Sequence, residues 1–213
     1  MTTEDKLRTK IMDIANFYAV NETYEWNDRL NELIEVYNSH KPLTRNIKYS
    51  KDMNPNGWCA LFVSAVYILA GLSDLIVTEI GAWEFKDNAK KCGEWKARES
   101  GYIPKRGDIV VYSWDAVKDS KKYTQYHVGI ITNSDASINY STEGNVASRV
   151  MMIATPPNDK RIEGYWAVNF EEYAAKLDRE MILPVIPKKA GVYDLRCEVM
   201  EDGKSEVYWN PVR

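Results

Sequence analysis

The longest apolar stretch of the chain runs from Ala60 to Ala70, and its only polar atoms belong to Ser64 and to the hydroxyl of Tyr67. Gly71 follows directly, and glycine suits the left-handed position that ends many helices. An apolar run of this length, closed by glycine, predicts a helix over about 58–70 that is buried on most of its circumference. The run is too short to span a bilayer. We therefore expect the rest of the chain to pack around this helix.

Apolar residues recur every three to four positions on both sides of this stretch, which is the period of an amphipathic helix. These stripes predict helices over 4–20, 26–38 and 83–92. The polar, proline-containing segment over 38–56 predicts a loop. The first part of the chain is thus expected to be helical.

After Pro104 the hydrophobic period shortens to two, which indicates strands. The predicted strands cover 108–114, 126–132, 137–143, 146–153 and 162–168, with a bend or hairpin at Gly144-Asn145. Helices followed by antiparallel strands are typical of an α+β fold.

The length of 213 residues fits one domain with an appendage. We expect the domain over 1–170 and the appendage over 171–213, with its role open. A short helix over 170–179 and a hairpin formed by 192–199 and 205–209 are the elements predicted there.

Charge and composition exclude several classes of function. A net charge of −3 and a pI near 5.6 provide no general basic surface, which argues against nucleic acid as a partner. The polar, acidic N-terminus is followed by no apolar segment, so we expect no signal peptide, no membrane insertion and synthesis in the cytoplasm. The three cysteines, Cys59, Cys92 and Cys197, are odd in number and widely spaced, which argues against a disulfide framework and a Cys-x-x-Cys metal site.

Cys59 is predicted in the first turn of the apolar helix, where free N–H groups and the helix dipole favour a thiolate. A nucleophile is therefore one interpretation, and a small buried apolar residue is the other. The chain has only two histidines, so few residues can serve as the base of such a site. His40 lies in a polar loop and is expected to be solvated. His127 begins an apolar strand, where it is either structural or an acid–base group.

The next predicted strand ends in Glu143-Gly144-Asn145, and residues two apart on a strand point to the same side. A cysteine hydrolase needs a thiolate, an imidazole that takes and returns its proton, and a carboxylate or amide that orients the imidazole. Adjacent strands that carry His127 and Glu143, packed against the start of the Cys59 helix, would supply all three groups.

Several segments, in the same order, resemble the CHAP family, the cysteine, histidine-dependent amidohydrolases/peptidases of bacterial cell-wall lysis. The similar segments are Trp58-Cys59-Ala60-Leu61-Phe62-Val63-Ser64, Gly101-Tyr102-Ile103-Pro104-Lys105-Arg106-Gly107-Asp108-Ile109-Val110, His127-Val128-Gly129-Ile130-Ile131, Glu143-Gly144-Asn145 and Ile162-Glu163-Gly164-Tyr165. The resemblance covers about 5–170 and implies a papain-like α+β fold, with N-terminal helices on an antiparallel sheet of five to six strands.

The resemblance also implies a role for each site residue. Cys59 would be the nucleophile, His127 the general base and acid, Glu143 the group that orients the imidazole, and Asn145 a fourth polar member of the site. The backbone N–H of Cys59 would stabilise the oxyanion. Many members of the family have glutamine directly before the cysteine, where this chain has Trp58, so the second oxyanion donor is open. Asn54 and Asn56 are alternatives for it.

Aromatic side chains near these segments are candidates for the walls of a substrate groove, the alternative being core packing. We expect Trp58, Trp114 and Tyr126 to bind substrate, and Trp83, Phe85, Trp95 and Tyr123 are further candidates for groove walls. The segment Asp52-x-Asn54-x-Asn56-Gly57 matches the first half of a calcium-binding loop, but Val63 stands where the final glutamate belongs. No metal or other cofactor is expected, and a calcium site here is the minor alternative.

The function implied by the resemblance is thiol-dependent hydrolysis of an amide bond in bacterial peptidoglycan. The bond is either the link from muramic acid to the first alanine or one within the stem peptide or cross-bridge. A phage or prophage endolysin released through a membrane pore, or an injected effector, would reach the wall without a signal peptide. The alternatives are a non-catalytic wall-binding or phage-tail module, and a cytoplasmic amidase or peptidase acting on a small peptide. The oligomeric state is open.

Overall fold

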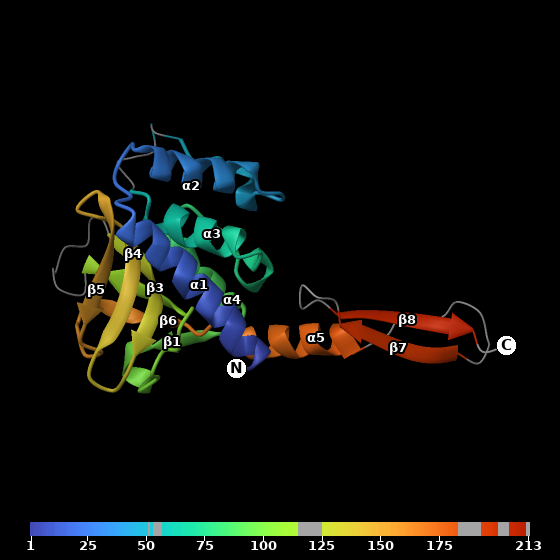
Figure 1. The fold of residues 1–213 in the computed structure, drawn as a ribbon. Helices are drawn as coiled ribbons and strands as arrows, with labels where there is room; N and C mark the ends of the chain where they lie inside the picture. The colour runs from blue at the N-terminus through green and yellow to red at the C-terminus, as the bar shows by residue number, and fades with distance from the viewer. Residues whose placement is uncertain (51, 53–56, 115–124, 183–192, 200–204, 212–213) are drawn as a thin grey trace. The chain divides into compact units, whose positions relative to one another are not determined.

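The computed structural model (Figure 1) describes residues 1–50, 52, 57–114, 125–182, 193–199 and 205–211. The chain forms two compact units, Met1–Tyr173 and Ala174–Arg213. The division between them falls in the first turn of α5 (Phe170–Ile182). We expected a boundary after residue 170, at the start of this helix.

The first unit is an α+β fold in which helices precede an antiparallel sheet, as the sequence predicts (Figure 1). Its longer helices are α1 (Thr3–Val20), α2 (Asp28–Ser39), α3 (Cys59–Leu69) and α4 (Ala82–Lys91). Its strands are β1 (Trp95–Ala97), β2 (Ile109–Ser113), β3 (Tyr126–Ser134), β4 (Asn139–Val146), β5 (Arg149–Thr155) and β6 (Ile162–Trp166). Short 3₁₀ turns cover Thr44–Asn46, Ser73–Leu75 and Arg98–Ser100. The sequence pattern missed β1, because three residues are too few to show a period.

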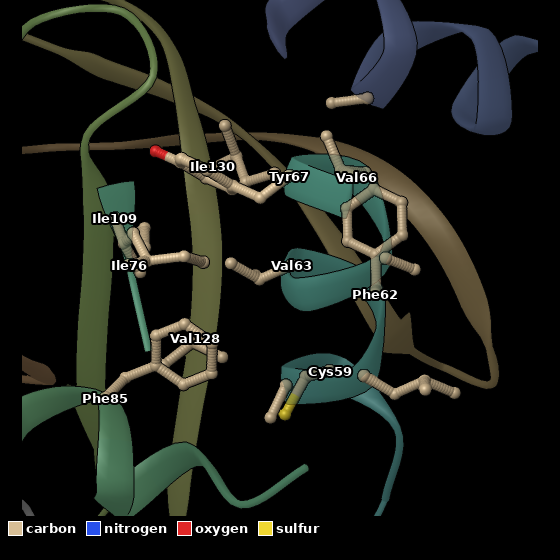
Figure 2. Packing of buried hydrophobic residues seen from close by; sticks show 14 of the residues in the cluster. Cys59, Phe62, Val63, Val66, Tyr67, Ile76, Phe85, Ile109, Val128 and Ile130 are labelled. Carbon is tan, nitrogen blue, oxygen red and sulfur yellow. The ribbon is translucent and has the colours of Figure 1, made fainter. Parts of the chain in front are cut away.

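The six strands lie in the order β1-β6-β2-β3-β4-β5, and every neighbouring pair is antiparallel. Helix α3 packs on β3 and β4, and α2 covers the other side of α3 (Figure 1). The main hydrophobic core lies between the helices and the sheet, and Figure 2 shows Val63 of α3 and Val128 of β3 among its members. The opposite face of the sheet carries a smaller cluster that includes Tyr112 and Tyr165.

Helix α3 is buried on every residue from Cys59 to Tyr67, which explains its uniformly apolar sequence. Gly71 ends the helix as predicted: it adopts φ +67°, and its N–H donates to the carbonyl of Ile68. The hydroxyl of Ser64 both donates to the carbonyl of Glu79 and accepts from the N–H of Glu79, each at 2.7 Å. The hydroxyl of Tyr67, the other polar group of the run, donates to the carbonyl of Gly107, so both polar side chains are satisfied within the buried helix.

The turn before β2 is held by a buried carboxylate. Asp108 is fully buried and accepts from the hydroxyl of Tyr102 at 2.6 Å and from the N–H of Lys105 at 2.8 Å. Arg8 of α1 adds an ion pair to Asp108 at 3.2 Å, and Tyr67 of α3 donates to the carbonyl of Gly107. The segment 101–110, noted above for its family resemblance, thus has a structural role in joining the turn to two helices.

One sequence prediction about the strands is wrong in its details. The hairpin between β4 and β5 does not turn at Gly144-Asn145, where the sheet has a β-bulge instead. The turn lies at Ala147 and Ser148, which have φ +48° and +61°, and Val146 pairs with Arg149 across it. Two-residue hairpin loops of this kind usually carry glycine or asparagine, so the sequence contains no signal for the turn.

The second unit contains a hairpin of β7 (Tyr193–Val199) and β8 (Ser205–Pro211), in which Tyr193 pairs with Pro211 and Val199 with Ser205. The sequence predicts these strands, while the connection at 200–204 lies outside the described residues.

The pairing of Arg8 with Asp108 gives a testable measure of what holds the helices to the sheet. Replacing Arg8 by Met keeps much of its packing but leaves the buried carboxylate without its cation, so the free energy of unfolding should fall by about 3 kcal/mol. Arg29→Met is the matched control, because the pair of Arg29 with Glu32 is exposed at 43% and 44% and should contribute less than about 1 kcal/mol. Urea denaturation followed by circular dichroism measures both changes. An equal effect of the two variants would contradict this role of Arg8.

Candidate active site

Cys59 is the first residue of α3, with Trp58 at the N-cap position. Figure 2 shows Cys59 at this end of the helix, on the side that faces Val128 of β3. The residue is 5% exposed and therefore buried. The helix begins without a side-chain cap, which leaves backbone N–H groups free to stabilise a negative charge there.

The thiol of Cys59 interacts with the imidazole of His127, which stands near the start of β3. Burial would raise the pKa of the thiol, but the charge and hydrogen bond of His127 outweigh it, helped by the backbone N–H groups of Val128 and Ala60, so the pKa is lowered. Burial conversely disfavours the imidazolium, but the interactions with Cys59 and Glu143 raise the pKa of His127 to about 10. A thiolate–imidazolium pair is the state that these shifts favour.

Glu143 of β4 holds the other side of the imidazole. Its Oε2 lies 2.8 Å from Nε2 of His127, which leaves Nδ1 as the ring nitrogen available to Cys59. Burial raises the pKa of Glu143, but its hydrogen bond and charge interaction with His127 outweigh burial and lower the pKa. The carboxylate therefore stays ionised, fixes the ring orientation and stabilises the imidazolium.

Two hydroxyl groups that the sequence reasoning missed complete the surroundings of this carboxylate. Oε1 of Glu143 accepts from the hydroxyl of Tyr112 at 2.7 Å and from that of Ser141 at 2.5 Å. Tyr112 pairs with His127 across β2 and β3, and Ser141 precedes Glu143 by two residues on β4. The period of two could have identified Ser141, whereas Tyr112 needs the strand register.

Two glycines allow parts of the chain to approach each other closely at the site. A Cβ atom on Gly129 would lie 2.5 Å from Cγ of Glu143, so a larger residue on β3 would displace the carboxylate. A Cβ atom on Gly144 would lie 2.5 Å from Cβ of Phe62, which shows how tightly β4 packs on α3. The approach at Gly129 thus leaves room for the Glu143 side chain beside β3, and the approach at Gly144 holds the start of α3 close to β4.

Asn145 is close to the segment that leads into Cys59. It has φ +62°, and a Cβ atom on Gly57 would lie 2.5 Å from its Nδ2. Its side chain also lines a pocket beside His127 and Glu143. The structure thus brings all four expected polar residues to one place, with Asn145 next to the backbone that precedes Cys59.

The pocket beside the catalytic groups has a volume of about 270 Å³ and is lined by Tyr112, Trp114, His127, Glu143, Asn145, Val146, Ala147, Ile153, Thr155 and Arg161. The ring of Trp114 is 38% exposed, and its centroid lies 5.8 Å from that of His127. Of the three aromatic residues expected to bind substrate, Trp114 is the one positioned on this pocket.

The other two aromatic residues are placed differently. Trp58 is fully buried and packs near Gly144, so its side chain has no surface with which to touch a substrate, contrary to our expectation. Its Nε1 has no hydrogen-bond partner among the described residues. Tyr126 is half-buried and packs edge to face with Trp83, with ring centroids 4.9 Å apart. Its strand position directs it to the face opposite His127.

The remaining candidates lie away from this place or outside the description. Asn54 and Asn56, the alternatives for the second oxyanion donor, are not among the described residues, and neither is most of the segment that matches half a calcium loop. The described part of the chain holds no cluster of three or more His, Cys, Asp or Glu side chains suited to a metal ion. Within that part, no helix has both the length and the apolar character needed to cross a bilayer.

Comparison with known proteins gives one match. The family model of the CHAP domain matches residues 49–145, a range that contains Cys59, His127, Glu143 and Asn145. Neither a curated protein nor a solved structure matches the chain. The matched range begins before α3 and ends at Asn145 within β4, so it contains the parts of α3, β3 and β4 that supply these four side chains. Residues 49–145 of the chain therefore match the CHAP domain family.

Proposed function

We propose that the protein hydrolyses an amide bond of bacterial peptidoglycan through a covalent intermediate on Cys59. The observation that carries the proposal is the buried Cys59, His127 and Glu143 system beside an open pocket, within a CHAP domain. The family supports an amidase or peptidase acting at the cell wall, as either a muramoyl-alanine amidase or an endopeptidase. A phage endolysin is one such protein.

The chemistry follows from the charges of the site. The thiolate of Cys59 forms a bond to the amide carbonyl carbon, and the negative charge that develops on the oxygen meets the N–H groups at the start of α3. The C–N bond then breaks while the imidazolium of His127 gives its proton to the leaving amine. In the second half, His127 takes a proton from water, the hydroxide adds to the thioester, and the carboxylic acid leaves as the thiolate returns. Glu143 keeps the ring oriented through both halves.

Hydrolysis of purified walls tests this function directly. The wild-type protein should lower the turbidity of a wall suspension, and Cys59→Ala should reduce the rate by at least about a thousandfold because the nucleophile is gone. Cys92→Ala is the matched control, since Cys92 is a free, exposed thiol that takes no part in the site, and its rate should be unchanged. Masses of the released fragments identify the bond.

Two outcomes would contradict the proposal in different ways. Lysis by Cys59→Ala at the wild-type rate would refute the mechanism. If walls from several bacterial types resist the wild-type protein while small peptides are cleaved, the substrate class is wrong and a peptidase of small peptides is favoured. Binding to walls without cleavage would favour a non-catalytic module.

The pH dependence of thiol alkylation should separate the two cysteines of the first unit. The pKa of Cys59 is lowered, whereas burial and the charge of Glu94 raise the pKa of Cys92. Iodoacetamide should therefore modify Cys59 well below the usual pH range of thiols and Cys92 only above it, as measured by peptide mass spectrometry. His127→Ala should move the reaction of Cys59 to higher pH, because burial then acts on the thiol without a cation to oppose it. Unchanged alkylation of Cys59 in this variant would disprove the ion pair.

Tyr112 is expected to act as a positioning residue through Glu143. Tyr112→Phe removes one hydrogen bond to the carboxylate and should lower kcat by about tenfold, with little change in KM. The same change should move the alkaline limb of the pH–rate profile, because Glu143 helps to set the pKa of His127, which is about 10. Tyr165→Phe is the matched control: this buried tyrosine accepts from Asn139 at 2.8 Å in the same cluster and touches no catalytic group. Equal profiles for the two variants would contradict the role of Tyr112.

A further inference from the structure

The pocket beside His127 combines apolar walls with a cation. Val146, Ala147 and Ile153 provide apolar surface, and the ring of Trp114 borders it. Among the residues that line the pocket, Arg161 carries the positive charge of a lysine or arginine side chain. It comes from the turn that precedes β6. It lies outside the segment matched by the family model, so the family does not assign it a role.

The guanidinium of Arg161 is held in place rather than free to swing. Its Nε donates to Oδ1 of Asp159 at 3.0 Å and its Nη2 donates to Oδ2 at 2.6 Å, while the backbone N–H of Arg161 donates to the same carboxylate at 2.8 Å. Its Cζ lies 5.8 Å from the ring centroid of Trp114. Because Asp159 and Trp114 of the chain itself order this side chain, little side-chain entropy is lost when a ligand binds.

Part of this cation remains available to a ligand. Asp159 occupies Nε and Nη2, and among the residues that the structure describes Nη1 has no hydrogen-bond partner. The side chain is 48% exposed. Glu143, the other carboxylate on the pocket, is already satisfied by His127, Tyr112 and Ser141 and does not need Arg161. A donor is thus left over at the pocket beside the site of bond cleavage.

We propose that Arg161 forms a subsite for a carboxylate of the substrate, located on the residue next to the scissile amide. The inference rests on the proposed function and deepens it. Such a subsite would favour stem-peptide substrates with a free carboxylate at this position over substrates in which the carboxylate is amidated. A planar guanidinium matches a carboxylate in shape and charge, and the apolar walls suit the carbon chain of an amino-acid residue. The guanidinium would bind the carboxylate of a side chain and that of a chain terminus equally well. Substrates amidated at each position distinguish the two.

The test uses soluble stem peptides with all carboxylates free and analogues amidated at one carboxylate at a time. For the wild-type protein, amidation of the carboxylate that Arg161 binds should lower kcat/KM by roughly tenfold, because a charge-assisted hydrogen bond is lost. The change should lie mainly in KM, and amidation of the other carboxylates should have little effect. Arg161→Gln should lose about the same factor on the free peptide and no longer distinguish that analogue. The position of the sensitive amidation identifies which carboxylate binds.

Two further variants make the comparison specific. Arg29→Gln is the matched control, because Arg29 is similarly exposed at 43%, is also paired with a carboxylate, and lies on α2 rather than on the pocket. It should leave both kcat/KM and the preference unchanged. Arg161→Lys keeps the charge without the planar donors and should restore part of the preference. An unchanged preference in Arg161→Gln, with hydrolysis intact, overturns the subsite but leaves the proposed function standing.

A binding measurement keeps the subsite testable if no wall or stem peptide is hydrolysed, in which case the proposed function fails. Acetyl-alanyl-glutamate and its diamide are titrated into Cys59→Ala, and the NMR signal of the Trp114 indole N–H is followed. Tighter binding of the carboxylate form, lost in Cys59→Ala/Arg161→Gln, supports the subsite independently. Equal binding of the acid and the diamide overturns it.

Discussion

The buried charges of Cys59, His127 and Glu143 impose the constraint on which the rest of the first unit depends. Two of these groups are negative in the state that the pKa shifts favour, and one is positive, so burial leaves an excess of negative charge. An uncompensated buried charge is strongly destabilising. The surroundings provide the compensation: the hydroxyls of Tyr112 and Ser141 donate to Glu143, and the start of α3 faces the thiolate.

This compensation works only if two layers of the fold keep a fixed spacing. The thiol belongs to a helix, whereas the imidazole and the carboxylate belong to the sheet. Because α3 is buried on nearly its whole surface, it cannot slide without disturbing contacts on every side. Gly144 allows β4 to approach Phe62 and Trp58 closely, and a side chain at this position would push the helix away from the sheet. The apolar character of the helix and the reactivity of its first residue are therefore linked.

Much of this arrangement is predictable from the sequence, because hydrophobic period and local signals determine it. The run that ends at Gly71 specifies α3, and the scarcity of histidine makes His127 the natural partner of Cys59. What the sequence does not reveal depends on side-chain direction or strand register. Trp58 is next to the nucleophile in the chain, but its indole is buried, and Tyr112 reaches Glu143 only because β2 and β3 pair in one particular register. The turn at Ala147 was missed because its residues carry no signal for a positive φ.

The proposed catalytic groups and the far wall of the pocket come from different segments of the chain. The proposed catalytic groups Cys59, His127 and Glu143 come from segments inside the matched range 49–145, at the start of α3 and on β3 and β4. The far wall of the pocket comes from the β4–β5 turn, from β5 and from Arg161. Two residues of these later segments also support the carboxylate that orients His127: Thr155 of β5 is hydrogen-bonded to Tyr112, and Arg161 interacts electrostatically with Glu143. The family match covers the segments that carry Cys59, His127 and Glu143 but neither β5 nor Arg161, so the proposed choice between amide bonds should depend on residues beyond the matched segment.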